Sequence, residues 1–160
     1  MMTAKPASAS ATEMVQVVLP NDANPLGYIL GGTVMHLIDI AAAIAAHRHT
    51  RSRVVTAAVD GLRFLHPIKV GDLILLRARV TATFRTSLEV HVEVFSEGSL
   101  TGIRQLTSHA YLTFVAVDEH GARVSVTPLL LESDEDRRRS EDAHLRRAER
   151  LRKRTEETEG

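Results

Sequence analysis

The chain has 160 residues and no cysteine, which excludes disulfides, thiolate nucleophiles and zinc–sulfur sites. Lysine plus arginine and aspartate plus glutamate number 20 each, and the formal net charge of zero leaves no global basic field for nucleic acid or an anionic membrane. With 44% hydrophobic residues, this length suits one domain with a real core. We expect one compact domain that does not bind nucleic acid and whose chemistry depends on oxygen and nitrogen groups.

The amino-terminal segment, residues 1–12, is small and polar and contains no apolar core segment. It therefore has the pattern of neither a secretory signal nor a membrane anchor, and we expect it to be disordered. The most apolar stretch, Ile38 to Ala46, is far shorter than the roughly 20 residues that span a bilayer. A cytoplasmic location without membrane attachment is the expectation.

The first predicted element is a short strand from Glu13 to Leu19, which is followed by a turn-rich stretch. Residues from Thr33 to about His47 are good helix formers, and their apolar side chains recur at the spacing of one helical face. The other faces of this helix are also mostly apolar, and only His36 and Asp39 interrupt them. Such a helix is typical of one surrounded by protein.

Four strand-like runs follow, with the apolar side chains alternating at a period of two: residues 54–64, 73–84, 88–94 and 103–117. The second and third are separated by little more than Arg85 and Thr86, which predicts an antiparallel hairpin. In the first, the alternation changes parity at Asp60-Gly61, which predicts a β-bulge and a bent strand. The chain is therefore predicted to be α+β, with a curved sheet wrapping one helix, over residues 13–130.

Residues 131–160 form a segment of different composition, rich in arginine and acidic residues, which we expect to be a charged helical tail outside the core. Opposite charges four residues apart support an exposed helix, at Glu135/Arg139, Asp142/Arg146 and Glu149/Lys153. A solvated helix that frays at its end is the simplest interpretation. The alternative is that the arginines at 137–139 and 146–147 meet phosphates or a partner subunit.

Asp39 is the first candidate catalytic residue, because a carboxylate inside an apolar helix costs several kcal/mol unless it is paired, hydrogen-bonded or neutralised. A structural alternative is a bond from Asp39 to a backbone amide or to an arginine of the sheet. Gly31 and Gly32 lie where the helix starts, and unpaired amides with the positive end of the helix dipole make an oxyanion site in outline. The pair could also be a flexible turn.

Two other polar features have simple structural explanations. On position alone, Asn24 is best interpreted as the first residue of an Asn-Pro turn. His47 and His49 lie two residues apart at a helix end, which is typical of a capping or surface pair rather than a metal site. We therefore expect no metal and no cofactor.

The stretches LPNDANPLGYILGGTVMHLID (Leu19 to Asp39) and VVTAAVDGLRFLHPIKVGD (Val54 to Asp72) resemble the acyl-CoA thioesterases of the hotdog fold. Within that family, the chain is most similar to the bacterial YciA-type hydrolases and the brain-type cytosolic acyl-CoA hydrolases. The resemblance runs from about Val15 to Val117 and does not cover the tail. It implies a central helix wrapped by the sheet, in a homodimer that pairs its sheets edge to edge and that in such enzymes often stacks into a hexamer, a trimer of dimers.

The resemblance also implies roles for the candidate residues. Asp39 matches the catalytic acidic residue of the family, either as general base or as nucleophile, and Asn24 matches an asparagine that completes the site from the partner protomer. Gly31 and Gly32 lie where helix-start amides hold the thioester carbonyl. A hairpin that approaches the coenzyme A part of the substrate is matched by Arg85, Thr86 and Ser87.

The implied reaction is hydrolysis of an acyl-CoA to a free acid and coenzyme A, which belongs to fatty acid metabolism. Coenzyme A is then part of the substrate and not a cofactor. Two alternatives share the fold. One is a non-catalytic acyl-CoA-binding module that senses its ligand, and the other is a hydratase or dehydratase that would use His36 together with Asp39. The length of the acyl chain is left open.

Overall fold

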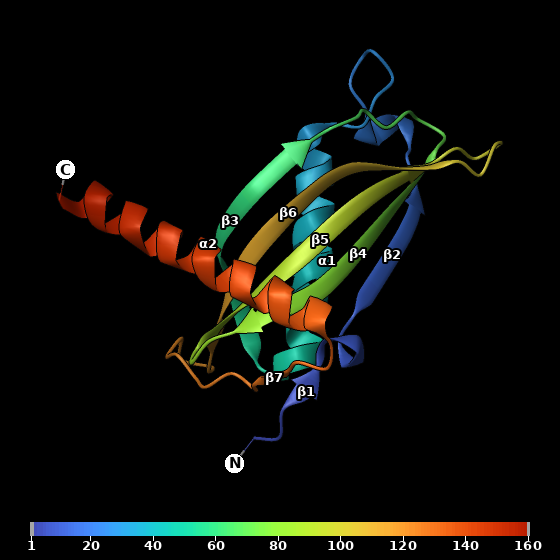
Figure 1. Cartoon of the computed structure of the whole chain (residues 1–160). Helices are drawn as coiled ribbons and strands as arrows, with labels where there is room; N and C mark the ends of the chain where they lie inside the picture. Colours follow the sequence, from blue (N-terminus) through green and yellow to red (C-terminus); the bar gives the residue numbers. More distant parts are fainter. Residues whose placement is uncertain (1, 160) are drawn as a thin grey trace.

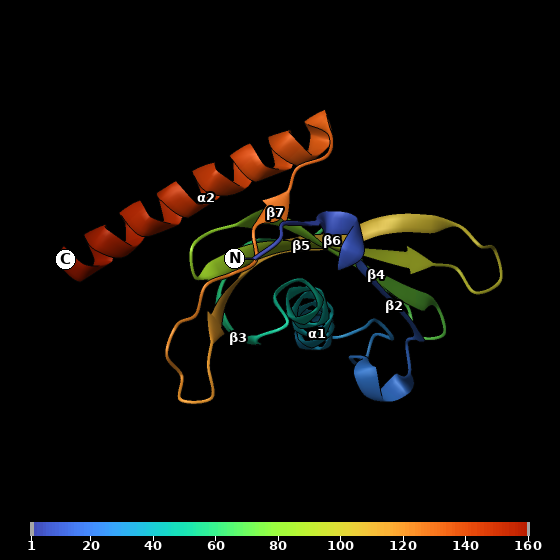
Figure 2. The ribbon, with the colours of Figure 1, turned by 90° about the horizontal axis from the view of Figure 1, so that it is seen from below.

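The computed structural model describes residues 2–159, and its centre is a curved antiparallel sheet of five strands in the order β2-β4-β5-β6-β3. These strands are β2 (Thr12–Val17), β3 (Arg53–Phe64), β4 (Leu73–Thr83), β5 (Ser87–Glu97) and β6 (Arg104–Val117). Helix α1 (Gly31–Thr50) lies in the concave face of the sheet, and helix α2 (Asp134–Glu159) crosses the opposite face (Figures 1 and 2). The α+β layout predicted from the sequence is therefore confirmed, and it is the hotdog fold that the resemblance implied.

The core lies between α1 and the sheet. The side of α1 that packs on the sheet is formed by completely or almost completely buried residues: Val34, Leu37, Ile38, Ala41, Ala42, Ala45, Ala46 and His49. Opposite them, alternate residues of the three central strands are buried, and they include Ile74, Leu76, Val90, Val92, Leu112 and Phe114. The period-two alternation of the sequence thus separates the face that holds α1 from the outer face. The small side chains of α1 allow close approach between helix and sheet.

Helix α1 is longer than the predicted range 33–47. It begins at Gly31 because the carbonyl of Leu30, a residue in extended conformation, accepts the amides of both Thr33 and Val34. It ends where Arg51 turns to a left-handed conformation with φ of 50°. The helix is also less enclosed than its composition suggested, since His36 and His47 are exposed and Asp39 is half-buried.

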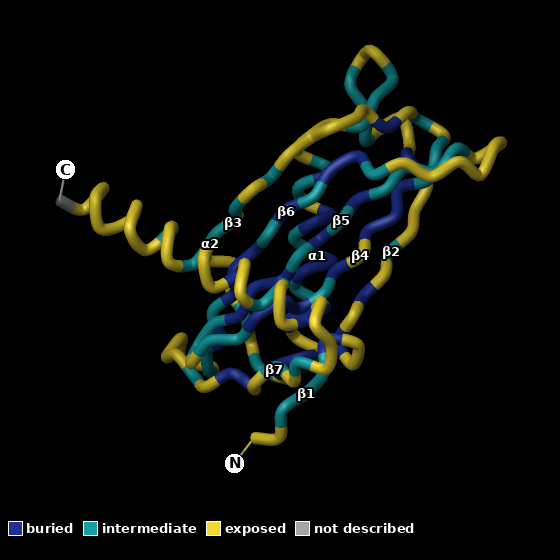
Figure 3. The backbone as a smooth tube through the Cα atoms, in the orientation of Figure 1, coloured by how far each residue is buried: buried dark blue, intermediate teal, exposed yellow. Residues whose placement is uncertain are grey.

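Strand β3 is one edge of the sheet, and it is the most exposed of the long strands (Figure 3). Its pairing with β6 shifts register between Asp60 and Arg63, where Gly61 has φ of +61°, so the predicted bulge is confirmed. A second shift lies at Thr56/Ala58 and was not predicted. Val55 and Val59 are 51% and 40% exposed. The apolar alternation of this strand therefore does not correspond to burial within one chain.

The amino-terminal segment has structure where disorder was expected. Lys5–Pro6 forms β1, which pairs in parallel with β7 (Leu129–Leu130), and a 3-10 turn follows at Ala7–Ala9. Ala7 is buried, and the Lys5 ammonium donates to the carbonyl of His49 at 3.1 Å near the end of α1. A second 3-10 turn, Pro20–Asp22, lies in the turn-rich stretch before α1. No helix within residues 2–159 is both long and apolar enough to cross a bilayer.

Helix α2 is the predicted charged tail, but it packs against the outer face of the sheet instead of standing in solvent. Ala143 is completely buried and Asp136 is 7% exposed. Of the three predicted pairs along the helix, Glu135–Arg139 is present at 2.6 Å. Arg146 does not pair with Asp142 but binds Glu89 of the sheet, because a buried carboxylate without another cation lies beneath it. Glu149 pairs with Arg152 in place of Lys153.

Candidate active site

Asp39 lies on the side of α1 that faces the edge strand β3. The hydroxyl Oγ1 of Thr56 donates a hydrogen bond to Oδ1 of Asp39 at 2.8 Å. Thr56 pairs with Phe114 of β6, whose side chain lies in the core, so both belong to the inner face of the sheet. The structural alternative required a backbone amide or an arginine to hold the carboxylate, and neither does so within residues 2–159. A second carboxylate oxygen remains for a water or a substrate.

Thr56 is a candidate site residue that sequence reasoning missed. It is the only polar side chain in the run from Val54 to Val59. That interruption was the available signal, because a hydroxyl within an apolar strand needs a partner if it faces inward. Threonine is common in strands, however, so the sequence gives no reason to pair this one with Asp39.

The start of α1 is an open group of hydrogen-bond donors. The first turn of a helix has no acceptors for its amides within the helix, and no side chain caps this one. Gly31 and Gly32 are exposed, and a Cβ atom at Gly32 would meet nothing within 4 Å. At Gly31 a Cβ would lie 3.5 Å from the ring of Phe64. The backbone at Gly32 is therefore open to a substrate oxygen, and at Gly31 the ring of Phe64 lies alongside.

Asn24 lies in the loop before α1, and it does act as the turn residue that its position predicts. Its side-chain oxygen Oδ1 accepts the amides of Leu26 and Tyr28 at 2.9 and 3.2 Å. The loop is joined to the helix start, since the amide of Leu30 donates to the carbonyl of Asp22. With Oδ1 occupied in this way, the Nδ2 amide of Asn24 forms no hydrogen bond within residues 2–159 and is the group that can act on a substrate.

The predicted site residues are not gathered in one place within one chain. Asp39 is eight residues beyond Gly31, which at 1.5 Å per residue is about 12 Å along the helix axis. Asn24 and the two glycines lie at the start of α1, whereas Asp39 and Thr56 lie beside the middle of β3. Each chain therefore carries two half-sites, which we call the amide half-site (Asn24, Gly31, Gly32) and the carboxylate half-site (Asp39, Thr56).

The hairpin between β4 and β5 lies near the C-terminal end of α1, at the opposite end of the molecule from the start of this helix. The carbonyls of Arg85 and Thr86 accept the amides of Val126 and Ala116, and Ser87 begins β5. Beside this end is an open cavity of about 770 Å³ whose lining includes three side chains that carry or can carry positive charge: His47, Arg51 and Arg53. Asp118 also lines it. The cavity therefore presents two arginines and a histidine beside one carboxylate.

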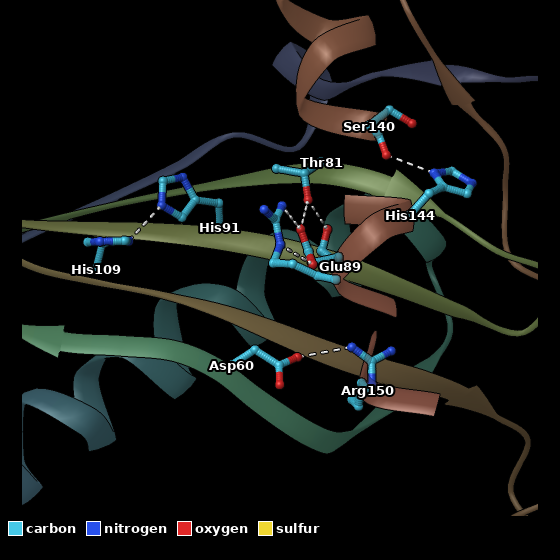
Figure 4. A network of polar contacts seen from close by, with 9 residues as sticks. Asp60, Thr81, Glu89, His91, His109, Ser140, His144 and Arg150 are labelled. Atoms are coloured by element: carbon cyan, nitrogen blue, oxygen red, sulfur yellow. Dashed lines mark hydrogen bonds and ion pairs between the residues drawn. The ribbon is translucent and has the colours of Figure 1, made fainter. Parts of the chain in front are cut away.

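A strongly shifted pKa lies elsewhere, at His91 under α2 on the outer face of the sheet (Figure 4). Burial, together with the neighbouring His109 and Arg146, lowers the pKa of His91 to about 4. Glu89 is 2% exposed and accepts two bonds from Arg146, at 2.7 and 3.0 Å, and one from the Thr81 hydroxyl at 2.6 Å. These groups fasten α2 to the sheet, and they lie on the opposite face from Asp39.

Comparison with known proteins identifies relatives of this chain. Residues 26–103 match the thioesterase superfamily. An uncharacterized acyl-CoA thioester hydrolase of Bacillus subtilis is 40% identical over 119 residues, covering 74% of this chain and 69% of that protein. The cytosolic acyl coenzyme A thioester hydrolase of Rattus norvegicus is 30% identical over 154 residues, which are 95% of this chain but only 40% of the rat protein.

Solved structures of similar proteins cover almost the whole chain, including α2. An apo-hexameric acyl-CoA thioesterase superposes with a TM-score of 0.90 and 41% identity, over 95% of this chain and 97% of the other. An acyl-CoA hydrolase from Staphylococcus aureus, solved with butyryl coenzyme A and coenzyme A, superposes with a TM-score of 0.90 and 34% identity, over 98% and 96%. The shared fold, the sequence similarity and the coverage together show that the chain belongs to the acyl-CoA thioester hydrolases of the thioesterase superfamily.

Proposed function

We propose that the chain hydrolyses acyl-CoA thioesters at a site formed by two copies, with Asp39 and Thr56 from one and Asn24, Gly31 and Gly32 from the other. The observation that carries this proposal is the separation of the two half-sites. A carbonyl under attack must lie about 3 Å from both the base or nucleophile and the oxyanion donors. Groups about 12 Å apart on one helix cannot meet this condition together.

The exposed edge of the sheet supplies the means of pairing. Strand β3 has one side free of strand partners, and it carries exposed apolar residues, among them Val55, Val59 and Phe64. An unpaired apolar edge strand favours pairing with another chain. Antiparallel pairing of β3 with its copy about a two-fold axis reverses the direction of the second molecule. The helix start of each copy then points to the part of the partner where α1 ends.

In the proposed reaction, the amides of Gly31 and Gly32 hold the thioester carbonyl and stabilise the negative charge that develops on its oxygen. Asp39 takes a proton from water while the water oxygen bonds to the carbonyl carbon. Thr56 holds one oxygen of the carboxylate, so the other faces the water. Nδ2 of Asn24 donates to the carbonyl or orients the water. Breakage of the carbon–sulfur bond then releases the free acid, and the leaving sulfur takes the proton and becomes the thiol of coenzyme A.

Comparison supports the choice of residues. The Staphylococcus aureus acyl-CoA hydrolase has also been solved with an asparagine, an aspartate or a threonine replaced by alanine. The positions of these three residues along that chain have the same spacing as Asn24, Asp39 and Thr56 here. His36 is exposed, and the partner of Asp39 is Thr56 instead. No observation favours a hydratase that would pair His36 with Asp39.

The proposal has three further parts, which concern coenzyme A binding, assembly and location. The phosphates of coenzyme A bind near the Arg85–Thr86–Ser87 hairpin and the cationic cavity of the partner, which the two-fold arrangement brings toward the helix start. Dimers stack into hexamers, as in the apo-hexameric acyl-CoA thioesterase. The protein acts in the cytoplasm, for which the cytosolic name of the rat relative is the support.

Substitution of Asp39 by asparagine tests the assignment, with coenzyme A release from an acyl-CoA followed by a thiol reagent. Since a general base contributes about 10²- to 10⁴-fold, we expect Asp39→Asn to lose at least about 100-fold in kcat. Asp142→Asn is the matched control, because its carboxylate is exposed on α2, and it should keep full activity. Circular dichroism and the oligomeric state of both variants should equal those of the wild type. If Asp39→Asn retains most of the activity, the assignment is wrong.

A further inference from the structure

A pocket opens directly beside the first turn of α1. It has a volume of about 270 Å³, and Gly31 is part of its wall. Most of the other wall residues are apolar, among them Ile29, Val34, Phe64, Leu65, Pro67 and Ile68. No lysine, arginine, aspartate or glutamate contributes to the wall, and His66 is its one ionisable side chain. Such a lining favours an uncharged apolar ligand and not a phosphate.

Backbone hydrogen bonds hold the pocket open in a defined shape. The amides of Leu65 and His66 both donate to the carbonyl of Thr107, at 2.7 and 3.2 Å. On the other side, the amide of Ile29 donates to the carbonyl of Ile68 at 2.8 Å. The walls are therefore the end of β3, the segment 65–68 that follows it, the part of β6 at Thr107 and Ser108, and the region around the start of α1.

The neighbours of this pocket indicate its occupant. In the proposed reaction the amides of Gly31 and Gly32 hold the thioester carbonyl, and the carbon chain of the acyl group begins at that carbonyl. The coenzyme A part carries phosphates, for which this pocket offers no cation, whereas the cavity with Arg51 and Arg53 lies at the other end of the molecule. We propose that the pocket between Phe64, Ile68 and Ser108 binds the acyl chain and limits its length. This inference rests on the proposed thioesterase function.

The volume sets the expected limit. At about 270 Å³ the pocket is small enough to enclose only a limited number of methylene groups. The substrates it fits are straight acyl chains of short and medium length. Longer acyl chains leave methylene groups outside the apolar walls, and these groups add no binding affinity.

Ser108 is the position at which this limit can be changed with least harm. It is 2% exposed, it lines the pocket, and its Oγ has no hydrogen-bond partner within residues 2–159. A change to valine therefore removes no hydrogen bond, suits a strand, and adds volume toward the pocket. Ile68 is also 2% exposed and lines the pocket, so Ile68→Ala enlarges it.

The test measures binding and hydrolysis separately. Binding is measured by calorimetry with S-alkyl coenzyme A thioethers of increasing chain length, which cannot be hydrolysed, and kcat/KM is measured with the matching acyl-CoA series. For the wild type, affinity should rise about fourfold for each methylene that is buried, and then stop rising at the chain length that fills the pocket. The controls are Ser96→Val on β5 and Ile74→Ala on β4, which make the same chemical changes outside the pocket.

The chain length at which thioether affinity stops rising, which we call the break, should become shorter by about two carbons in Ser108→Val. It should become longer in Ile68→Ala, and both controls should keep the wild-type break. The acyl-CoA series should show the same shifts in kcat/KM. A break that stays in place in both variants overturns the pocket as the acyl site, even if acyl-CoA is hydrolysed. Thioether binding with the expected shifts but no hydrolysis supports the pocket and contradicts the thioesterase function instead.

Discussion

The ion pair between Arg146 and Glu89 gives the sharpest test of how α2 is held on the sheet. Glu89 is 2% exposed, and the side chain of Arg146 is 24% exposed. Arg146 also lies over the ring of Tyr111, with its guanidinium carbon 3.6 Å from the ring centroid. Replacing Arg146 by methionine keeps the length of the side chain but leaves a buried carboxylate with only the Thr81 hydroxyl as donor. Burial of an unpaired charge is what makes this change severe.

Removing one partner of a buried ion pair costs about 3 to 5 kcal/mol, and the partial exposure of Arg146 places this case near the lower end. For a chain of this size, about 3 kcal/mol lowers the midpoint of thermal unfolding by roughly 6 to 12 °C. Replacing both groups, by Glu89→Gln with Arg146→Met, should recover much of the loss, because no charge is then buried alone. Activity toward acyl-CoA should change little in the folded protein, since the pair and Asp39 lie on opposite faces of the sheet.

The assay is urea and thermal unfolding at one fixed protein concentration, together with amide hydrogen exchange of α2. The matched control is Arg152→Met, because Arg152 is 54% exposed and pairs only with Glu149 and Glu156 on its own helix. Exposed pairs of this kind contribute little to stability, because water and salt screen their charges. The reasoning is refuted if Arg146→Met unfolds at the wild-type midpoint and α2 exchanges no faster, or if Arg152→Met is equally destabilised.

Three further predictions concern other groups. Burial and His109 lower the pKa of His91 to about 4, below its unfolded value of 6.5, so the free energy of unfolding should fall by up to about 3 kcal/mol as the pH drops from 6.5 to 4. In urea unfolding measured at several pH values, His91→Gln should lose less stability over this range. Gly61→Ala should lower the free energy of unfolding by about 1 to 2 kcal/mol, because φ is +61° and the new Cβ would lie 3.3 Å from Tyr111; an unchanged value would contradict a strained bulge. Arg51→Ala should raise KM for an acyl-CoA but not for the matching acyl-pantetheine, which lacks the nucleotide phosphates; equal effects would exclude Arg51 from phosphate binding.

The sequence predicted the fold well where hydrophobic periodicity is strong. All five long strands and α1 were found, because each has an apolar face that must be buried. The bulge at Gly61 was also visible, as a change of parity. The prediction was limited at the edge strand β3, where Val55 and Val59 are apolar yet exposed in the single chain. Their burial requires a second molecule, and no property of one strand distinguishes an inner face from an interface.

The packing of α2 was not predictable for a different reason. Helix–sheet packing is normally signalled by an apolar stripe, and α2 has a sparse one, in which Leu145 is 68% exposed. Its contact with the sheet depends on charge pairs across long sequence separations, such as Arg146 with Glu89 and Arg150 with Asp60. On the sheet, Glu89 alternates with valines as an ordinary outward residue does. Only the three-dimensional arrangement reveals that this outward face is covered.

The sequence singled out most of the candidate site residues, and the resemblance also implied that Asn24 comes from the partner protomer. Asp39 and the glycine pair were recognisable because a carboxylate in an apolar helix and an open helix start are unusual. Thr56 was missed, since its role depends on a contact between β3 and α1. The distance between the half-sites follows from helix geometry alone, once Gly31 and Asp39 are known to share one helix. That distance turns the dimer from an implied feature of the family into a requirement of the proposed chemistry.

Mixing two inactive variants tests this requirement directly. Asp39→Asn destroys the carboxylate half-site of a chain, and Asn24→Ala impairs its amide half-site. In a mixed dimer one site combines both defects, but the other combines an intact Asp39 with an intact Asn24. Random exchange of equal amounts gives half mixed dimers with one active site each, so about a quarter of the wild-type activity should return. If the two half-sites acted within one chain, every site in the mixture would carry a defect, and activity would stay at the level of the separate variants however complete the exchange.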